Sequence, residues 1–107
     1  MTVLEGAAPR DLAALKSLLA GAIGPVHYIS GGTDLLVAPR ALPDEGLLVD
    51  ISRIGGLTYV HHDGDWLRIG ATTSLAALAR NETVSKVLWA LARAAKQFGS
   101  AQIRNRA

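Results

Sequence analysis

The sequence predicts an α+β (mixed α/β) domain, in which a mixed sheet has flanking helices. Apolar residues recur at helical spacing in two stretches, Leu12–Ala22 and Val84–Phe98. Val26–Ile29 and Leu47–Ile51 are short apolar runs, which are typical of strands in a parallel sheet. An Asp-Gly pair between two further strand-like runs, at Asp63-Gly64, favours an antiparallel hairpin. Parallel and antiparallel pairs together predict the mixed sheet.

The first part of the chain is expected to place one helix between two strands. Thr2–Leu4 fits a short strand, and Pro9 fits a first helical turn, where its missing N–H costs nothing. Gly21 and the pair Gly24-Pro25 end the helix. The strand Val26–Ile29 then leads into a pair of glycines.

The middle of the chain predicts a short element and a loop before the next strand. Leu35–Ala38 continues as a short helix or strand until Pro39 and Pro43 break the pattern. The residues between Ala41 and Gly46 form a loop that leads into the strand Leu47–Ile51.

A hairpin and a capped helix follow. The hairpin strands are Leu57–His62 and Trp66–Ile69, and a turn of small residues comes after them. Thr73 or Ser74 is placed to cap a helix at Leu75–Ala79.

The last part of the chain predicts one long helix and an abrupt end. Asn81–Thr83 breaks the preceding helix and opens the next, Val84–Phe98 carries one helical stripe of apolar residues, and Gly99 stops it. Gln102–Ala107 carries no turn, cap or polar tail. The sequence therefore looks cut in mid-element, and we expect a fragment of a longer protein.

Composition excludes several classes of function. A chain of 107 residues suffices for one small domain with one core. It has no cysteine, which excludes disulfides, thiolate metal sites and a cysteine nucleophile. No apolar run is long enough to cross a bilayer, and no signal peptide is evident, so a cytoplasmic location is expected. Few aromatics lie among the basic residues near the C-terminus, so no nucleic-acid partner is expected.

The strongest candidate site is the stretch Val26–Val37, where an apolar run enters Ser30-Gly31-Gly32. Glycines allow positive φ and close approach to a ligand, so several backbone N–H groups can converge on one anion. This pattern fits a cradle for the phosphates of a cofactor. The alternative is a tight turn in which Thr33 or Asp34 caps the next element.

Other residues with reactive side chains fit structural roles better. His61 and His62 are adjacent on a strand and point to opposite faces, which favours a solvent-facing hairpin tip over a metal site. Nothing in the sequence shows that Asp34 and Asp50 meet. Ser30, Ser74 and Ser100 lack a base at an informative spacing. No catalytic residue and no metal site is predicted, so any chemistry would reside in a bound cofactor.

Three segments, Tyr28–Val37, Ile69–Thr73 and Gly99–Ala107, resemble the FAD-binding (medium) subunit of the molybdenum hydroxylases. That family includes the medium subunits of carbon monoxide dehydrogenase and of bacterial xanthine dehydrogenase. The resemblance spans nearly the whole chain. It implies that residues 1–107 are the N-terminal part of an FAD-binding fold of the vanillyl-alcohol oxidase/p-cresol methylhydroxylase type, truncated at the C-terminal end.

The resemblance also implies the residues that hold FAD. The first glycine-rich loop would wrap the pyrophosphate, Phe98 would lie against the FAD, and Ala107 would be the first residue of a second glycine-rich loop. No cofactor contact is carried onto Ile69–Thr73. Because the rest of the second loop is missing, residues 1–107 alone are expected to bind FAD weakly or not at all. The loop residues are Tyr28, Ile29, Ser30, Gly31, Gly32, Thr33, Asp34 and Leu35.

In this family a large subunit hydroxylates the substrate at a molybdopterin cofactor, and a small subunit carries 2Fe-2S clusters. The resemblance implies that the flavin subunit passes their electrons to an acceptor such as NAD or a quinone. The lack of cysteine fits a chain without iron–sulfur ligands. Two alternatives remain from the residues: a small α/β module that binds a phosphate or nucleotide without redox activity, and a structural fragment that binds nothing alone.

Overall fold

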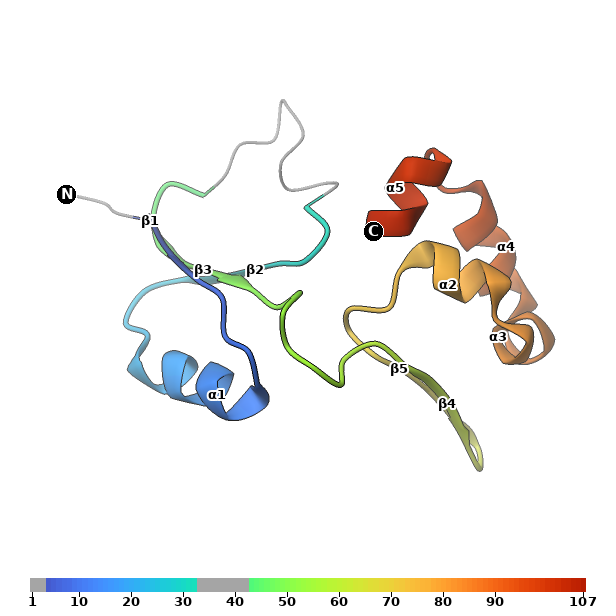
Figure 1. The fold of residues 1–107 in the computed structure, drawn as a ribbon, viewed down its shortest axis with the longest axis horizontal. Coiled ribbons are helices and arrows are strands. Elements are labelled where there is room, and N and C mark those ends of the chain that lie inside the picture. The colour runs from blue at the N-terminus through green and yellow to red at the C-terminus, as the bar shows by residue number, and fades with distance from the viewer. Residues whose placement is uncertain (1–3, 33–42) are drawn as a thin grey trace. The chain divides into compact units, whose positions relative to one another are not determined.

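The computed structural model describes residues 4–32 and 43–107. The chain divides into two compact units, Met1–Gly55 and Gly56–Ala107, and each is described by itself (Figure 1). Within the described residues, no helix is both long and apolar enough to span a membrane. Mixed α and β structure is confirmed. The predicted single mixed sheet is wrong, because within the described residues the parallel and the antiparallel strands form two separate sheets.

The first unit contains a three-stranded sheet. Its strands lie in the order β1 (Leu4–Ala7), β3 (Gly46–Asp50), β2 (Val26–Ile29), and both pairs are parallel. Val49, in the central strand, is fully buried. The predicted boundaries of β2 are confirmed, and β3 begins one residue before the predicted strand. The parallel pairing places the carboxyl ends of all three strands at one edge of the sheet.

The helix of the first unit is α1 (Leu12–Gly21), and it begins later than predicted. Asp11 is its N-cap, because the Asp11 side chain accepts a hydrogen bond of 2.7 Å from the backbone N–H of Ala14. Pro9 therefore lies before the helix, and the prediction that it forms the first turn is wrong. No residue of α1 is fully buried in this unit.

The second unit opens with an antiparallel hairpin, β4 (Val60–Asp63) and β5 (Trp66–Ile69). Asp63 pairs with Trp66, so the loop between them is only Gly64-Asp65. Gly64 has a φ of 57° at the first loop position, where a type II′ turn carries its glycine. The predicted hairpin is confirmed, but its first strand begins at Val60 instead of Leu57 and includes Asp63, which was predicted to lie in the turn.

Four short helices complete the second unit: α2 (Leu75–Arg80), α3 (Glu82–Val87), α4 (Trp89–Gln97) and α5 (Ala101–Arg106). Polar side chains cap three of them, because Ser74, Asn81 and Ser100 each accept a backbone N–H from the first turn of the helix that follows. The small core of this unit lies between α2, α3 and α4 (Figure 1). Its buried members are Leu78, Ala79, Val84, Ala92 and Ala95.

The predicted continuous helix Val84–Phe98 is wrong, because the chain breaks at Leu88. The Leu88 N–H donates to the Val84 carbonyl at 2.8 Å, and the Leu88 carbonyl accepts from Leu91 and Ala92. One non-helical residue, Leu88, thus ends α3 and begins α4. The helical spacing of apolar residues continues across this break. This spacing therefore predicts a single helix and does not reveal the break at Leu88.

The segment after β5 is held against the segment before β4. The Gly70 N–H donates to the Tyr59 carbonyl at 2.9 Å. A Cβ on Gly70 would overlap the carbonyl oxygen of Leu57 and lie 2.9 Å from the Tyr59 ring. Only glycine allows the two segments to approach this closely.

Replacing Gly70 with alanine is therefore expected to destabilise the protein, because backbone atoms must shift to admit the methyl group. The expected loss in free energy of unfolding is about 2 kcal/mol, measured by urea denaturation with circular dichroism. Gly55→Ala is the control, because a Cβ there meets nothing within 4 Å and should change stability by less than about 0.5 kcal/mol. Equal effects of the two substitutions would contradict the steric explanation.

Candidate functional site

The glycine turn begins at the carboxyl end of β2. Ser30, Gly31 and Gly32 follow the strand directly, and Gly32 has a φ of 74°, a conformation that favours glycine. Within the described residues, no group accepts a hydrogen bond from the backbone N–H of Gly31 or Gly32. In open sheets with parallel strands, ligands bind beside these carboxyl ends. Donors without partners at this edge fit an anion such as a pyrophosphate.

The end of β3 fixes the start of this turn. The Ile51 N–H donates to the Ile29 carbonyl at 3.0 Å, so the residue before Ser30 is tied to the neighbouring strand. Asp50 pairs with Ile29 in the sheet, and its Oδ1 accepts from the Ser52 hydroxyl at 2.6 Å and the Ser52 N–H at 2.9 Å. The Ser52 hydroxyl, then its N–H, lower the pKa of Asp50, and the charge of Arg53 lowers it further. Asp50 is therefore an ionised turn residue and not a general base.

Only part of the predicted loop lies in the described structure. Tyr28 is the third residue of β2, and its side chain is 53% exposed, so the ring is free to meet a ligand. Ile29 and Ser30 are half-buried. Thr33, Asp34 and Leu35 lie outside the described residues, as does the short element predicted at 35–38.

The other two predicted cofactor residues, Phe98 and Ala107, belong to the second unit. Phe98 is the C-cap of α4, and its side chain is 53% exposed. The next residue, Gly99, has a φ of 55°, which reverses the chain into α5 as predicted from its helix-stopping role. Ala107 ends α5, and its carbonyl accepts the Leu75 N–H at 2.6 Å, at the start of α2.

The third motif, Ile69–Thr73, has a structural role. The Thr73 hydroxyl donates to the Tyr59 carbonyl and accepts from the Tyr59 N–H, both at 3.1 Å. The Thr58 and Thr72 hydroxyls lie 2.8 Å apart, and the Thr72 N–H donates to the Leu57 carbonyl. The motif therefore joins the segments on either side of the hairpin, and these bonds involve only the protein's own groups.

The histidine pair lies on β4 with both side chains exposed. The His61 ring stacks on the Tyr59 ring, with centroids 4.8 Å apart. Among residues 4–32 and 43–107, no group of three or more His, Cys, Asp or Glu is placed to hold a metal ion. His61 thus packs on Tyr59, which lies just before β4.

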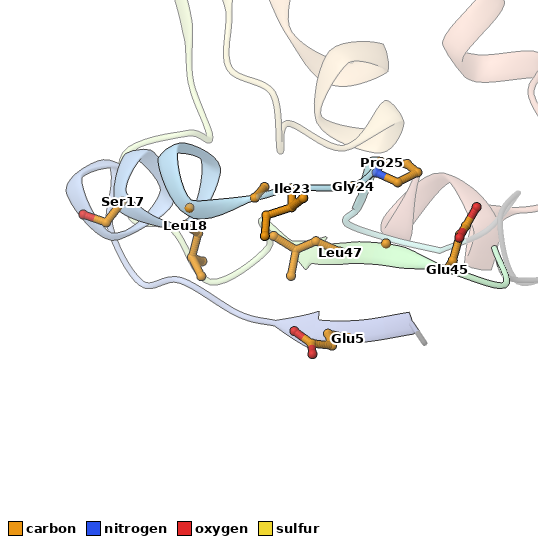
Figure 2. Close-up of a pocket in the computed structure, with 11 residues that line it drawn as sticks. Glu5, Ser17, Leu18, Ile23, Gly24, Pro25, Glu45 and Leu47 are labelled. Atoms are coloured by element: carbon orange, nitrogen blue, oxygen red, sulfur yellow. The ribbon is translucent and has the colours of Figure 1, made fainter. Parts of the chain in front are cut away.

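A hollow in the first unit lies at the opposite end of β2 from the glycine turn. It is lined by Leu18 and Leu47 and by the acidic residues Glu5 and Glu45, with the loop Ile23–Pro25 beside it (Figure 2). None of the described residues that line it is basic. Two carboxylates would repel a pyrophosphate, so this hollow does not fit the cofactor phosphates.

A comparison with known protein families shows to which family the chain belongs. Residues 4–107 match the family described as the FAD binding domain in molybdopterin dehydrogenase. The chain belongs to this family.

Relatives of this FAD-binding domain agree with the assignment. The nicotinate dehydrogenase FAD-subunit of Eubacterium barkeri is 32% identical over 98% of this chain. The nicotine 6-hydroxylase medium subunit of Paenarthrobacter nicotinovorans is 33% identical over 73% of it. The chain spans 36% and 28% of the length of these two proteins.

A solved structure of carbon monoxide dehydrogenase from Hydrogenophaga pseudoflava shares the fold of this FAD-binding domain. The TM-score is 0.80 with 31% sequence identity, over 98% of this chain and 37% of the other. The two sequence relatives and this solved structure therefore agree with the family match over residues 4–107.

Thr73→Val is expected to lower the free energy of unfolding by about 2 kcal/mol, because it removes both hydroxyl bonds and leaves the half-buried Tyr59 N–H unpaired. Thr73→Ser keeps the hydroxyl and should retain most of the stability. Urea denaturation compares the two variants. If Thr73→Val unfolds like the wild type, the structural role of this motif is wrong.

The Asp50 turn predicts an acid dependence. Because the pKa of Asp50 is lowered in the folded state, its stabilising effect is present above the unfolded pKa and is lost as the pH falls through the folded pKa. Between about pH 5 and pH 2, Asp50→Asn should therefore lose less stability than the wild type. Ser52→Ala removes the main cause of the shift and should also flatten this decline, measured by urea denaturation at each pH. If the free energy of unfolding falls with pH to the same extent in the wild type, Asp50→Asn and Ser52→Ala, this explanation is wrong.

Proposed function

We propose that this chain is the FAD-binding part of the flavin subunit of a molybdenum-containing hydroxylase or dehydrogenase. The observation that carries the proposal is the family match over residues 4–107. Two relatives, a medium subunit and an FAD-subunit, support it by their names. The fold would then be the N-terminal part of the vanillyl-alcohol oxidase type.

The chain's contribution to this function is to hold the cofactor. The N–H groups of Gly31 and Gly32, which meet no acceptor within the described residues, suit the pyrophosphate, and the exposed rings of Tyr28 and Phe98 suit the apolar surfaces of FAD. When bound, FAD supplies the redox chemistry. The protein's groups bind and orient it. The remaining proposed contacts are Ile29, Ser30, Thr33, Asp34, Leu35 and Ala107.

The partners follow from the same proposal. A large subunit with the molybdopterin cofactor and a small subunit with 2Fe-2S clusters would supply the electrons, and NAD or a quinone would accept them. Residues 1–107 contain no cysteine, so iron–sulfur ligands would come from outside this segment. The cytoplasmic location expected from the sequence stays a prediction.

The direct test is the visible absorbance of the intact gene product after it is mixed with FAD and desalted. A retained flavin band is expected. A protein that stays colourless and cannot be reconstituted would refute the proposal. The same measurement on residues 1–107 alone shows whether the first glycine turn suffices to retain the cofactor.

Gly32→Ala is expected to weaken FAD binding by the intact gene product about tenfold, because an L-residue at positive φ costs roughly 1–2 kcal/mol. Titration by flavin fluorescence measures the dissociation constant. Gly6→Ala is the matched control in the same unit, because its Cβ meets nothing within 4 Å. A similar loss in both variants would show that the turn is not the phosphate site.

A further inference from the structure

The connection between α4 and α5 is held by one long side chain. Arg104, on α5, donates from Nη1 to the Phe98 carbonyl at 3.2 Å and to the Gly99 carbonyl at 3.1 Å. The Phe98 carbonyl belongs to the C-cap of α4, where carbonyls lack partners within the helix. The guanidinium therefore satisfies two acceptors that an ordinary helix end leaves to water.

The backbone around Phe98 is fixed from several directions. Gly99 lies in the left-handed region, and a Cβ there would press on the Ile103 side chain at 3.2 Å. The Ser100 hydroxyl accepts the Ile103 N–H at 3.2 Å and caps α5. Only a short turn separates α4 from α5, and Arg104 reaches back across it.

The Phe98 side chain itself contributes nothing to the core of this unit. It is 53% exposed, and the buried core consists of other residues. A large apolar ring on a rigid, exposed turn is suited to contact a ligand, because little conformational entropy is lost when the ligand binds. Arg104 is thus placed to keep this ring in one position.

We propose that Arg104 is a positioning residue for FAD binding: its two hydrogen bonds hold the Phe98–Gly99 turn so that the Phe98 ring is presented to the cofactor. This inference rests on the proposed function, and it assigns Arg104 no direct contact with FAD. A charge alone would not fix this geometry, whereas the two N–H groups of Nη1 can bond both neighbouring carbonyls.

Arg104→Met in the intact gene product tests the inference. The expected result is FAD binding about tenfold weaker than in the wild type, since charge-assisted hydrogen bonds typically contribute roughly 1.5–3 kcal/mol. Arg106→Met is the matched control, because it removes the same charge from the same helix, and the Arg106 side chain makes no hydrogen bond within the described residues. It should change the dissociation constant less than about twofold.

Arg104→Lys separates positioning from folding. It keeps the charge, but its ammonium differs from the guanidinium in reach and geometry, so it should fold like the wild type while restoring only part of the affinity. The visible circular dichroism of the bound flavin reports its surroundings independently of stability. This signal should change in Arg104→Met and not in Arg106→Met.

A double-mutant cycle shows whether Arg104 acts through Phe98. Once Phe98→Ala has removed the ring, adding Arg104→Met should weaken FAD binding little further. Independent, multiplicative losses would overturn the inference, as would unchanged affinity in Arg104→Met. A wild-type protein without any FAD affinity would refute the proposed function itself, which is a separate outcome.

Discussion

The rest of this structure depends on one constraint: each unit buries few apolar side chains. Within the described residues, the core consists of eight side chains, and four of them are alanines. The helices are short, and α1 buries none of its residues fully. Short helices with so little packing are marginal by themselves. Their ends and turns must therefore be fixed by other interactions.

Polar side chains bonded to the backbone supply these interactions. Asp11, Ser74, Asn81 and Ser100 cap four helices, and the Thr73 hydroxyl joins two strand-flanking segments. Each bond satisfies a backbone group that would otherwise lack a partner. The same principle operates at the proposed cofactor residues, where turns expose an aromatic ring or unpartnered N–H groups. Structural and binding roles thus depend on the same local geometry.

Local signals in the sequence predicted much of this fold. β2, the hairpin, the Ser74 cap and the reversal at Gly99 each follow from a few neighbouring residues. The break at Leu88 could not be predicted, because the apolar period of the helix continues through it. Helix α1 begins after Asp11 and not at Pro9. The Asp11 side chain caps the first turn, and this cap contributes more to helix stability than the favourable φ of proline.

Side-chain hydrogen bonds to backbone carbonyls could not be predicted from the sequence. The partners of Thr73 and Arg104 are carbonyls, which every residue has, so no residue type marks them. The glycine pair and Phe98 were identified as candidates from local pattern and from the family resemblance. Helix α5 was not predicted from the sequence, because the residues after Gly99 look like an element that is cut short, although Ser100 is a suitable N-cap.

The Phe98–Gly99 turn is shaped by groups of the polypeptide alone. A surface of this kind does not need its ligand in order to form. If FAD binds here as proposed, this turn would not have to reorganise on binding, and the association would lose little conformational entropy.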